Sequence, residues 1–111
     1  MSKNPKKYLY DVAQAIDIIF LHHLQGVESL ADFEASITVQ NAVERQIGII
    51  GEAIYRLRQQ GLTLTDTDNI INFRNTLIHQ YDKIKVSTLW TFTQRLPALK
   101  TEVDQLLARE E

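Results

Sequence analysis

The apolar residues of this chain recur at intervals of three and four, and that spacing restricts the fold more than any other feature of the sequence. Between Pro5 and about Gln25 the apolar positions fall on one face of a helix: Leu9, Val12, Ala13, Ile16, Ile19, Phe20 and Leu24. Asn4 is a suitable N-cap before Pro5, and Gly26 is a suitable C-terminal stop. The segment therefore predicts a long amphipathic helix.

Three further long helices or helical segments and one short helix are predicted along the chain. A short helix should begin at Ser29, and a long one should run from about residue 38 to residue 60, where Gly61 ends it. The polar stretch LTLTDTDN offers caps for the next helix, whose apolar residues are Ile70, Ile71, Phe73, Leu77 and Ile78. The last helix begins near Ser87. Pro97 should kink or split it, because proline removes a backbone hydrogen bond and clashes one turn back.

No stretch alternates apolar and polar residues for long enough to require a strand. The connections between the helices are short, which favours antiparallel neighbours. We therefore expect a single all-α domain over residues 1–111, built as an antiparallel up-and-down bundle of four to five helices. With 111 residues, 44% of them hydrophobic and 23% charged, the chain has the composition of an ordinary globular domain.

Charge and composition exclude several classes of protein. The net charge of −2 argues against the broad basic face of a non-specific nucleic-acid binder, so any contact with RNA or DNA must be local. There is no cysteine, which excludes disulfides and thiolate metal sites and agrees with a reducing compartment. No run of about 18 apolar residues occurs, and the N-terminal lysines precede no uninterrupted apolar segment. These features predict a cytoplasmic protein that does not enter a membrane.

Two glycines, Gly48 and Gly51, lie inside the predicted long helix, where each is unfavourable by about 1 kcal/mol relative to alanine. Being three residues apart, they occupy neighbouring positions on the helix surface and would let another helix come close. No predicted strand precedes them, as a phosphate-binding loop would require. We interpret them as packing positions rather than as ligand contacts.

The stretch RNTLIHQY, residues 74–81, is the candidate site. Asn75 and His79 are four apart and share a helical face, whereas Arg74 and His79 point about 140° apart on an ideal helix. One helix does not gather the whole set, but a two-fold pair of chains places each motif opposite its twin. The alternative is ordinary helix-end chemistry, in which Asn75 and His79 cap a helix end and Arg74 pairs with an acid on the surface.

These residue types are suited to proton transfer beside a phosphate. An imidazole titrates near neutral pH and serves as base or acid, while a guanidinium binds phosphate oxygens and stabilises the charge that develops on them. No carboxylate cluster accompanies them, so neither a divalent metal nor another cofactor is implied.

The segments IGIIGEAIYRL, FRNTLIHQYDKIKVSTLW and RLPAL together resemble the HepT-like toxins of the HEPN (higher eukaryotes and prokaryotes nucleotide-binding) superfamily. The resemblance covers nearly the whole chain. It implies a HEPN-like helical bundle that forms a homodimer through the motif helices and cuts RNA without metal. It also implies that Arg74, Asn75 and His79 form the catalytic set, an Arg-x4-His motif in the dimer cleft.

The same resemblance implies the biological setting. The HepT branch is typically paired with a small nucleotidyltransferase antitoxin, which would add AMP to Tyr81 and so neutralise the toxin. The resulting expectation is a metal-independent endoribonuclease of a type VII-like toxin–antitoxin system, with tRNA or mRNA as substrate. The alternative is a non-catalytic helical module that binds a nucleotidyltransferase or a nucleotide. Tyr81 also has a purely structural interpretation, as a half-buried ring packed on the final helix.

Several other residues have two interpretations each. Glu52 either orients Arg74 or faces water, while Lys83 and Lys85 are candidates for local positive charge near the motif. His22 and His23 are adjacent and diverge by about 100° on a helix, which makes them poor joint metal ligands. Tyr55 and Trp90 are interpreted as core residues rather than as platforms for base stacking.

Overall fold

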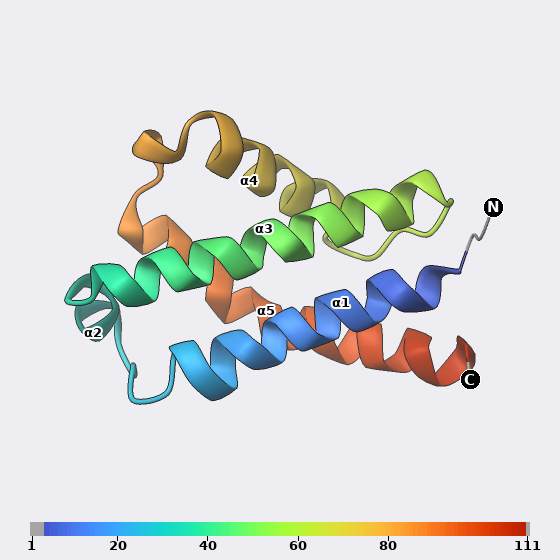
Figure 1. The fold of residues 1–111 in the computed structure, drawn as a ribbon, viewed down its shortest axis with the longest axis horizontal. Coiled ribbons are helices and arrows are strands. Elements are labelled where there is room, and N and C mark those ends of the chain that lie inside the picture. The colour runs from blue at the N-terminus through green and yellow to red at the C-terminus, as the bar shows by residue number, and fades with distance from the viewer. Residues whose placement is uncertain (1–3, 111) are drawn as a thin grey trace.

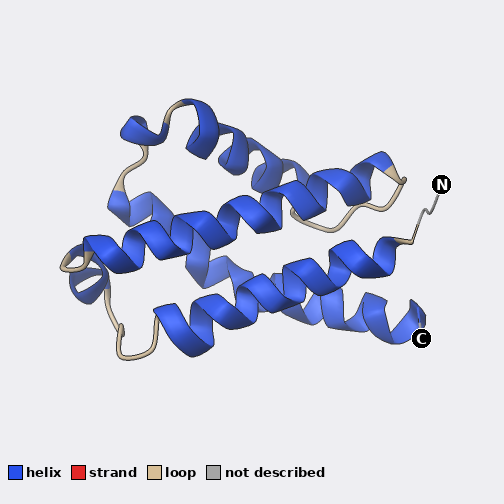
Figure 2. Ribbon diagram, viewed as in Figure 1, coloured by secondary structure: helices blue, strands red, loops and turns tan. Residues whose placement is uncertain are grey.

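The computed structural model describes residues 4–110, leaving aside the side chains of Tyr81 and Glu110, and this part of the chain is helical with no strand (Figure 2). The all-α prediction is confirmed. In chain order the elements are α1 (Pro5–Ile18), the π-helix η1 (Ile19–His23), α2 (Leu30–Glu34), α3 (Ile37–Gln59), α4 (Thr67–His79), the 3-10 turn η2 (Tyr81–Lys83) and α5 (Val86–Glu110).

The long helices alternate in direction, as an up-and-down bundle requires (Figure 1). Helix α1 packs against both α3 and α5, and the short α2 lies against α3 and α5 at one end of the bundle. Helix α4 lies along α3 on the side away from α1 (Figure 1). The bundle therefore consists of a three-helix centre with α4 as an outer helix.

One apolar cluster occupies the centre of the bundle. Its fully buried members come from the stripes on the first and third helices together with α2, α4 and α5, and include Leu9, Val12, Ile19, Phe33, Val43, Ile47, Ile50, Ile54, Leu57, Ile70 and Val103. Within residues 4–110 no helix is both long enough and apolar enough to cross a membrane.

The predicted caps of α1 and α2 and the predicted terminal glycines are confirmed, whereas Asp66 occupies the N-cap position of α4 without a capping hydrogen bond from its side chain. Asn4 Oδ1 accepts a hydrogen bond from the Lys6 amide at 2.9 Å, and Ser29 Oγ accepts one from the Asp32 amide at 3.1 Å. Gly26 and Gly61 follow the first and third helices with φ of 82° and 87°, the left-handed conformation that glycine adopts without strain.

The first helix differs from the prediction at its C-terminal end. Its α-helical part stops at Ile18, and the next turn is a π-helix, in which the Leu24 amide donates to the Ile19 carbonyl at 2.7 Å. The helix thus ends at His23, two residues before the predicted boundary. A period of three and four does not distinguish an α-helical last turn from a π turn.

Helix α5 is not split at Pro97, because a single helix runs from Val86 to Glu110. Its ribbon changes direction partway along its length (Figure 1). Leu96 and Leu99, on either side of the proline, are both buried, with 2% and 5% exposure. Burial of these neighbours holds the helix together across the missing backbone hydrogen bond.

Candidate functional site

The motif helix α4 approaches α3 closely at Gly51, which is buried. A Cβ added to Gly51 would lie 2.4 Å from the Cβ of Arg74 and 2.5 Å from its Cγ, distances that real side chains do not show. The packing interpretation is therefore confirmed for Gly51. At Gly48 an added Cβ would have no atom within 4 Å, so the same interpretation is wrong for Gly48 within the described chain.

The two glycines give a matched pair of substitutions. Gly51→Ala should destabilise the fold by about 1–2 kcal/mol, because overpacking against Arg74 exceeds the gain of about 1 kcal/mol from the better helix former. Gly48→Ala has open space and should instead raise the melting temperature. Thermal unfolding of both variants at equal protein concentration measures the difference. Equal melting temperatures would contradict the close α3–α4 contact.

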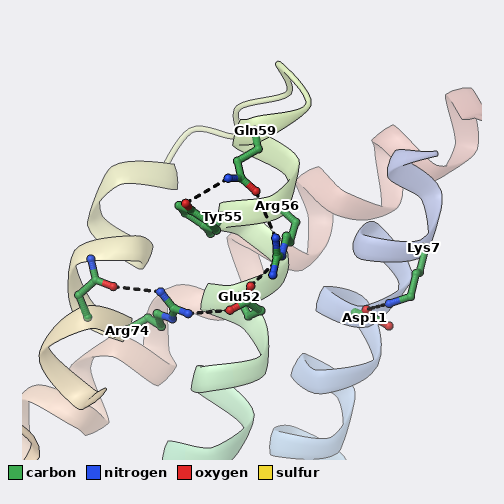
Figure 3. A network of polar contacts seen from close by, with 8 residues as sticks. Lys7, Asp11, Glu52, Tyr55, Arg56, Gln59 and Arg74 are labelled. Atoms are coloured by element: carbon green, nitrogen blue, oxygen red, sulfur yellow. Dashed lines mark hydrogen bonds and ion pairs between the residues drawn. The ribbon is translucent and has the colours of Figure 1, made fainter. Parts of the chain in front are cut away.

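Arg74 is held in place by three neighbours (Figure 3). Its Nη2 donates to Glu52 Oε1 at 2.6 Å, and its Nη1 donates to Asn75 Oδ1 at 3.1 Å. Its guanidinium carbon lies 5.9 Å from the centroid of the Tyr55 ring, within cation–π range. The Arg74 side chain is only 21% exposed. Of the two interpretations of Glu52, the contact with Arg74 is therefore the one observed.

His79 lies elsewhere on the same helix. It is the last residue of α4 and is exposed, and the Gln80 amide closes the helix by donating to the Thr76 carbonyl at 2.8 Å. No hydrogen bond joins His79 to Arg74, both of which are described. The structure thus brings Arg74, Asn75 and Glu52 together and leaves His79 outside their network, as the helical geometry predicts for one chain.

The residues just after the motif form a short turn. The Lys83 amide donates to the Gln80 carbonyl at 2.9 Å, and the side chains of Lys83 and Lys85 are exposed. The Tyr81 backbone belongs to the turn η2, whereas its side chain lies outside the described residues.

A cluster of arginines around Tyr55 was not predicted. The guanidinium carbons of Arg56, Arg58 and Arg74 lie 6.0, 5.8 and 5.9 Å from the centroid of this ring. Tyr55 does pack against the core as expected, but it is only half-buried. The signal in the sequence was the pair of arginines in YRLR directly after the tyrosine.

The remaining candidate residues are structural or exposed. Trp90 packs against the buried Phe33, with ring centroids 5.2 Å apart, which confirms its interpretation as a core residue. His22 is exposed and His23 is half-buried. Within the described residues no group of three or more His, Asp or Glu side chains is placed to hold a metal ion.

An open groove of about 630 Å³ is lined by residues of α1, α3 and α4. Its walls include two exposed apolar side chains, Ile49 and Ile78, at 38% and 53% exposure. Glu44 also lines the groove, and partial burial raises the pKa of its carboxyl. Ile78, one of these apolar side chains, is the residue directly before His79 at the end of the motif helix.

Comparison with known proteins identifies the family. The family model described as "Ribonuclease HepT-like" matches residues 12–106. The chain is 31% identical over 110 residues to the "Probable ribonuclease HepT" of Thermococcus cleftensis, covering 96% of this chain and 98% of that protein. It is 29% identical over 111 residues to the "Gamma-glutamylcyclotransferase and putative RNase MJ0434" of Methanocaldococcus jannaschii, covering 96% of this chain and 49% of that protein.

No solved structure gives a significant match to the chain. The family match extends from the middle of α1 to near the end of α5 and includes the whole motif helix. The family match and the similarity to the protein from Thermococcus cleftensis show that the chain belongs to the HepT-like ribonuclease family of HEPN proteins.

Proposed function

We propose that this protein is a metal-independent endoribonuclease. The observation that carries the proposal is the fixed position of Arg74, which is held by Glu52 of α3 and by its neighbour Asn75. Arg74 lies on α4, the helix that ends at the exposed His79. A guanidinium with a fixed orientation stabilises phosphate charge better than a mobile one, because little reorganisation is needed as the charge develops. The membership of the HepT-like ribonuclease family supports RNA as the substrate.

The reaction would be an attack by a ribose 2′-OH on the neighbouring phosphorus. The O2′–P bond forms and the P–O5′ bond breaks, which leaves a 2′,3′-cyclic phosphate and a free 5′-OH. One His79 takes the proton from the 2′-OH, and a second His79 gives a proton to the leaving oxygen. Arg74 stabilises the negative charge on the phosphorane, and Glu52 positions Arg74.

This division of work requires two chains. Arg74 faces α3 whereas His79 is exposed at the helix end, so among the described residues a single chain presents one imidazole at this end of α4. A two-fold homodimer in which the ends of α4 approach each other would supply both histidines to one cleft. The exposed Ile78, next to His79, is an apolar side chain that such a contact would bury.

The direct test is an RNA cleavage assay in EDTA with the purified, unmodified protein. We expect total RNA or tRNA to be cut, and the fragments to carry 2′,3′-cyclic phosphate ends. If the RNA stays intact although the mass of the protein shows no added AMP, the proposed ribonuclease activity is contradicted. The non-catalytic module that binds a nucleotidyltransferase or nucleotide would then be the better account.

We further propose that the protein is the toxin of a toxin–antitoxin pair, neutralised by AMP on Tyr81. This tyrosine lies two residues after His79, in the turn that follows the motif helix. AMP attached there would add bulk and negative charge near the position where the RNA phosphate binds, and would repel it.

Incubation with the cognate nucleotidyltransferase and ATP should raise the protein's mass by one or more AMP units and abolish cleavage. Tyr81→Phe should prevent both effects, because the substitution removes only the acceptor oxygen. Tyr10→Phe, on an exposed tyrosine of α1, is the matched control and should still be modified and inhibited. Unchanged modification of Tyr81→Phe would place the acceptor elsewhere.

A further inference from the structure

The arginines around Tyr55 form a charged surface beside the proposed catalytic arginine. We define this cluster as Tyr55, Arg56 and Arg58. The structure places both arginine side chains at the surface, with 50% and 41% exposure, on the last turns of α3. We propose that the cluster binds the phosphate backbone of the RNA next to the phosphate that is cleaved; the inference rests on the proposed ribonuclease function.

Glu52 bridges the cluster and Arg74 (Figure 3). One oxygen of this carboxylate accepts from Arg74 Nη2 at 2.6 Å, and the other pairs with Arg56 Nε at 2.9 Å. All three guanidinium carbons lie within 6.0 Å of the Tyr55 ring centroid, so no two of them are separated by more than about twice that distance. Arginines this close can contact phosphates of neighbouring nucleotides on one strand.

The Tyr55 ring orders the guanidiniums. Cation–π contact favours a guanidinium near an aromatic ring, and the half-buried ring is itself held against the core. The Tyr55 hydroxyl accepts a hydrogen bond from Gln59 Nε2 at 3.1 Å. The ring therefore acts as a fixed support that presents arginine donors at the surface.

The charges of the cluster, taken together with that of Arg74, favour the binding of an anion. Three guanidiniums, including that of Arg74, face two carboxylates, those of Glu52 and Asp68, so one positive charge remains there in a chain of net charge −2. The pair between Arg58 Nη1 and Asp68 Oδ1 spans 3.2 Å, and the Asp68 side chain is 85% exposed. Such an exposed pair contributes little stability in water, so Arg58 can exchange this partner for a phosphate.

Arg58→Gln tests the cluster without altering the contacts of Arg74. The matched control is Arg109→Gln, which removes the same charge from an exposed position near the end of α5. Both are made in a His79→Ala background, so that a labelled single-stranded RNA is bound and not cut. Fluorescence anisotropy at several salt concentrations gives the affinity and its salt dependence.

We expect Arg58→Gln to weaken RNA binding about 3- to 10-fold and to reduce the slope of log K against log salt by about 0.7, the value for one phosphate contact on a single strand. Arg109→Gln should change neither quantity. In the catalytically intact protein, Arg58→Gln should raise KM and leave kcat nearly unchanged, because the contact is made equally in the ground and transition states.

Equal affinity and equal slope for Arg58→Gln and Arg109→Gln would overturn the inference. The binding assay and the cleavage assay separate the two proposals. If the unaltered protein cuts RNA and the two variants bind alike, the cluster is not a phosphate site and the ribonuclease stands. If RNA is bound through Arg58 but never cut by the unaltered protein, the phosphate site stands and the catalytic function fails.

Discussion

Replacing His79 with alanine is expected to lower the rate of RNA cleavage by about 10²- to 10⁴-fold, the usual contribution of a general acid or base. The exposed position of His79 at the end of α4 means that its removal leaves no buried cavity, so the fold should be unaffected. Single-turnover cleavage of a defined RNA in EDTA measures the rate, and thermal unfolding measures the stability.

His22→Ala is the matched control, because His22 is also an exposed histidine at the end of a helix but lies in η1, outside the proposed site. It should cleave RNA at the unaltered rate. Arg74→Ala should reduce the rate by about 10²- to 10³-fold through loss of charge stabilisation. If His79→Ala keeps the full rate while the purified protein is active, the imidazole takes no part in the reaction.

Replacing Ile78 with glutamate is expected to convert the proposed dimer into monomers. Burial of one isoleucine contributes about 1.5–3 kcal/mol, and a two-fold interface loses that contribution twice, so the dissociation constant should rise at least about 10²-fold. Analytical ultracentrifugation over a range of concentrations measures the constant. Cleavage should fall with the fraction of dimer, because each cleft requires both histidines.

Leu21→Glu is the control for Ile78→Glu. Leu21 is also an exposed apolar residue, at 63% exposure against 53% for Ile78, but it lies in η1. We expect this variant to remain dimeric. A dimer that survives Ile78→Glu and dissociates with Leu21→Glu would move the interface to η1 and away from the motif helix.

Part of the site could be recognised from the sequence because it is local. Arg74, Asn75 and His79 lie within six residues on one helix, so residue type and spacing are sufficient to single them out. Their divergence around the helix was also predictable, and the structure agrees with it, since Arg74 bonds to Glu52 while His79 stays outside that network. Their catalytic roles remain a prediction.

The other part of the site depends on which faces of α3 and α4 meet. Glu52 and Arg74 are 22 residues apart, and two interpretations of Glu52 were equally compatible with the sequence. Gly48 and Gly51 had the same sequence signature, yet only Gly51 faces Arg74. The arrangement of three arginines around Tyr55 likewise combines residues from two helices. Periodicity identifies the buried stripe of a helix but not the partner residue opposite each position.

The sequence by itself determined the helical fold and most of its boundaries. Apolar spacing, the caps at Asn4 and Ser29, and the glycines at 26 and 61 act over a few residues, so they can be interpreted without tertiary information. Only the tertiary structure decided the π turn after Ile18, the continuity of α5 through Pro97 and the support of Arg74. The physical reason is that these features depend on packing between helices, which can override local preferences and which pairs residues distant in the sequence.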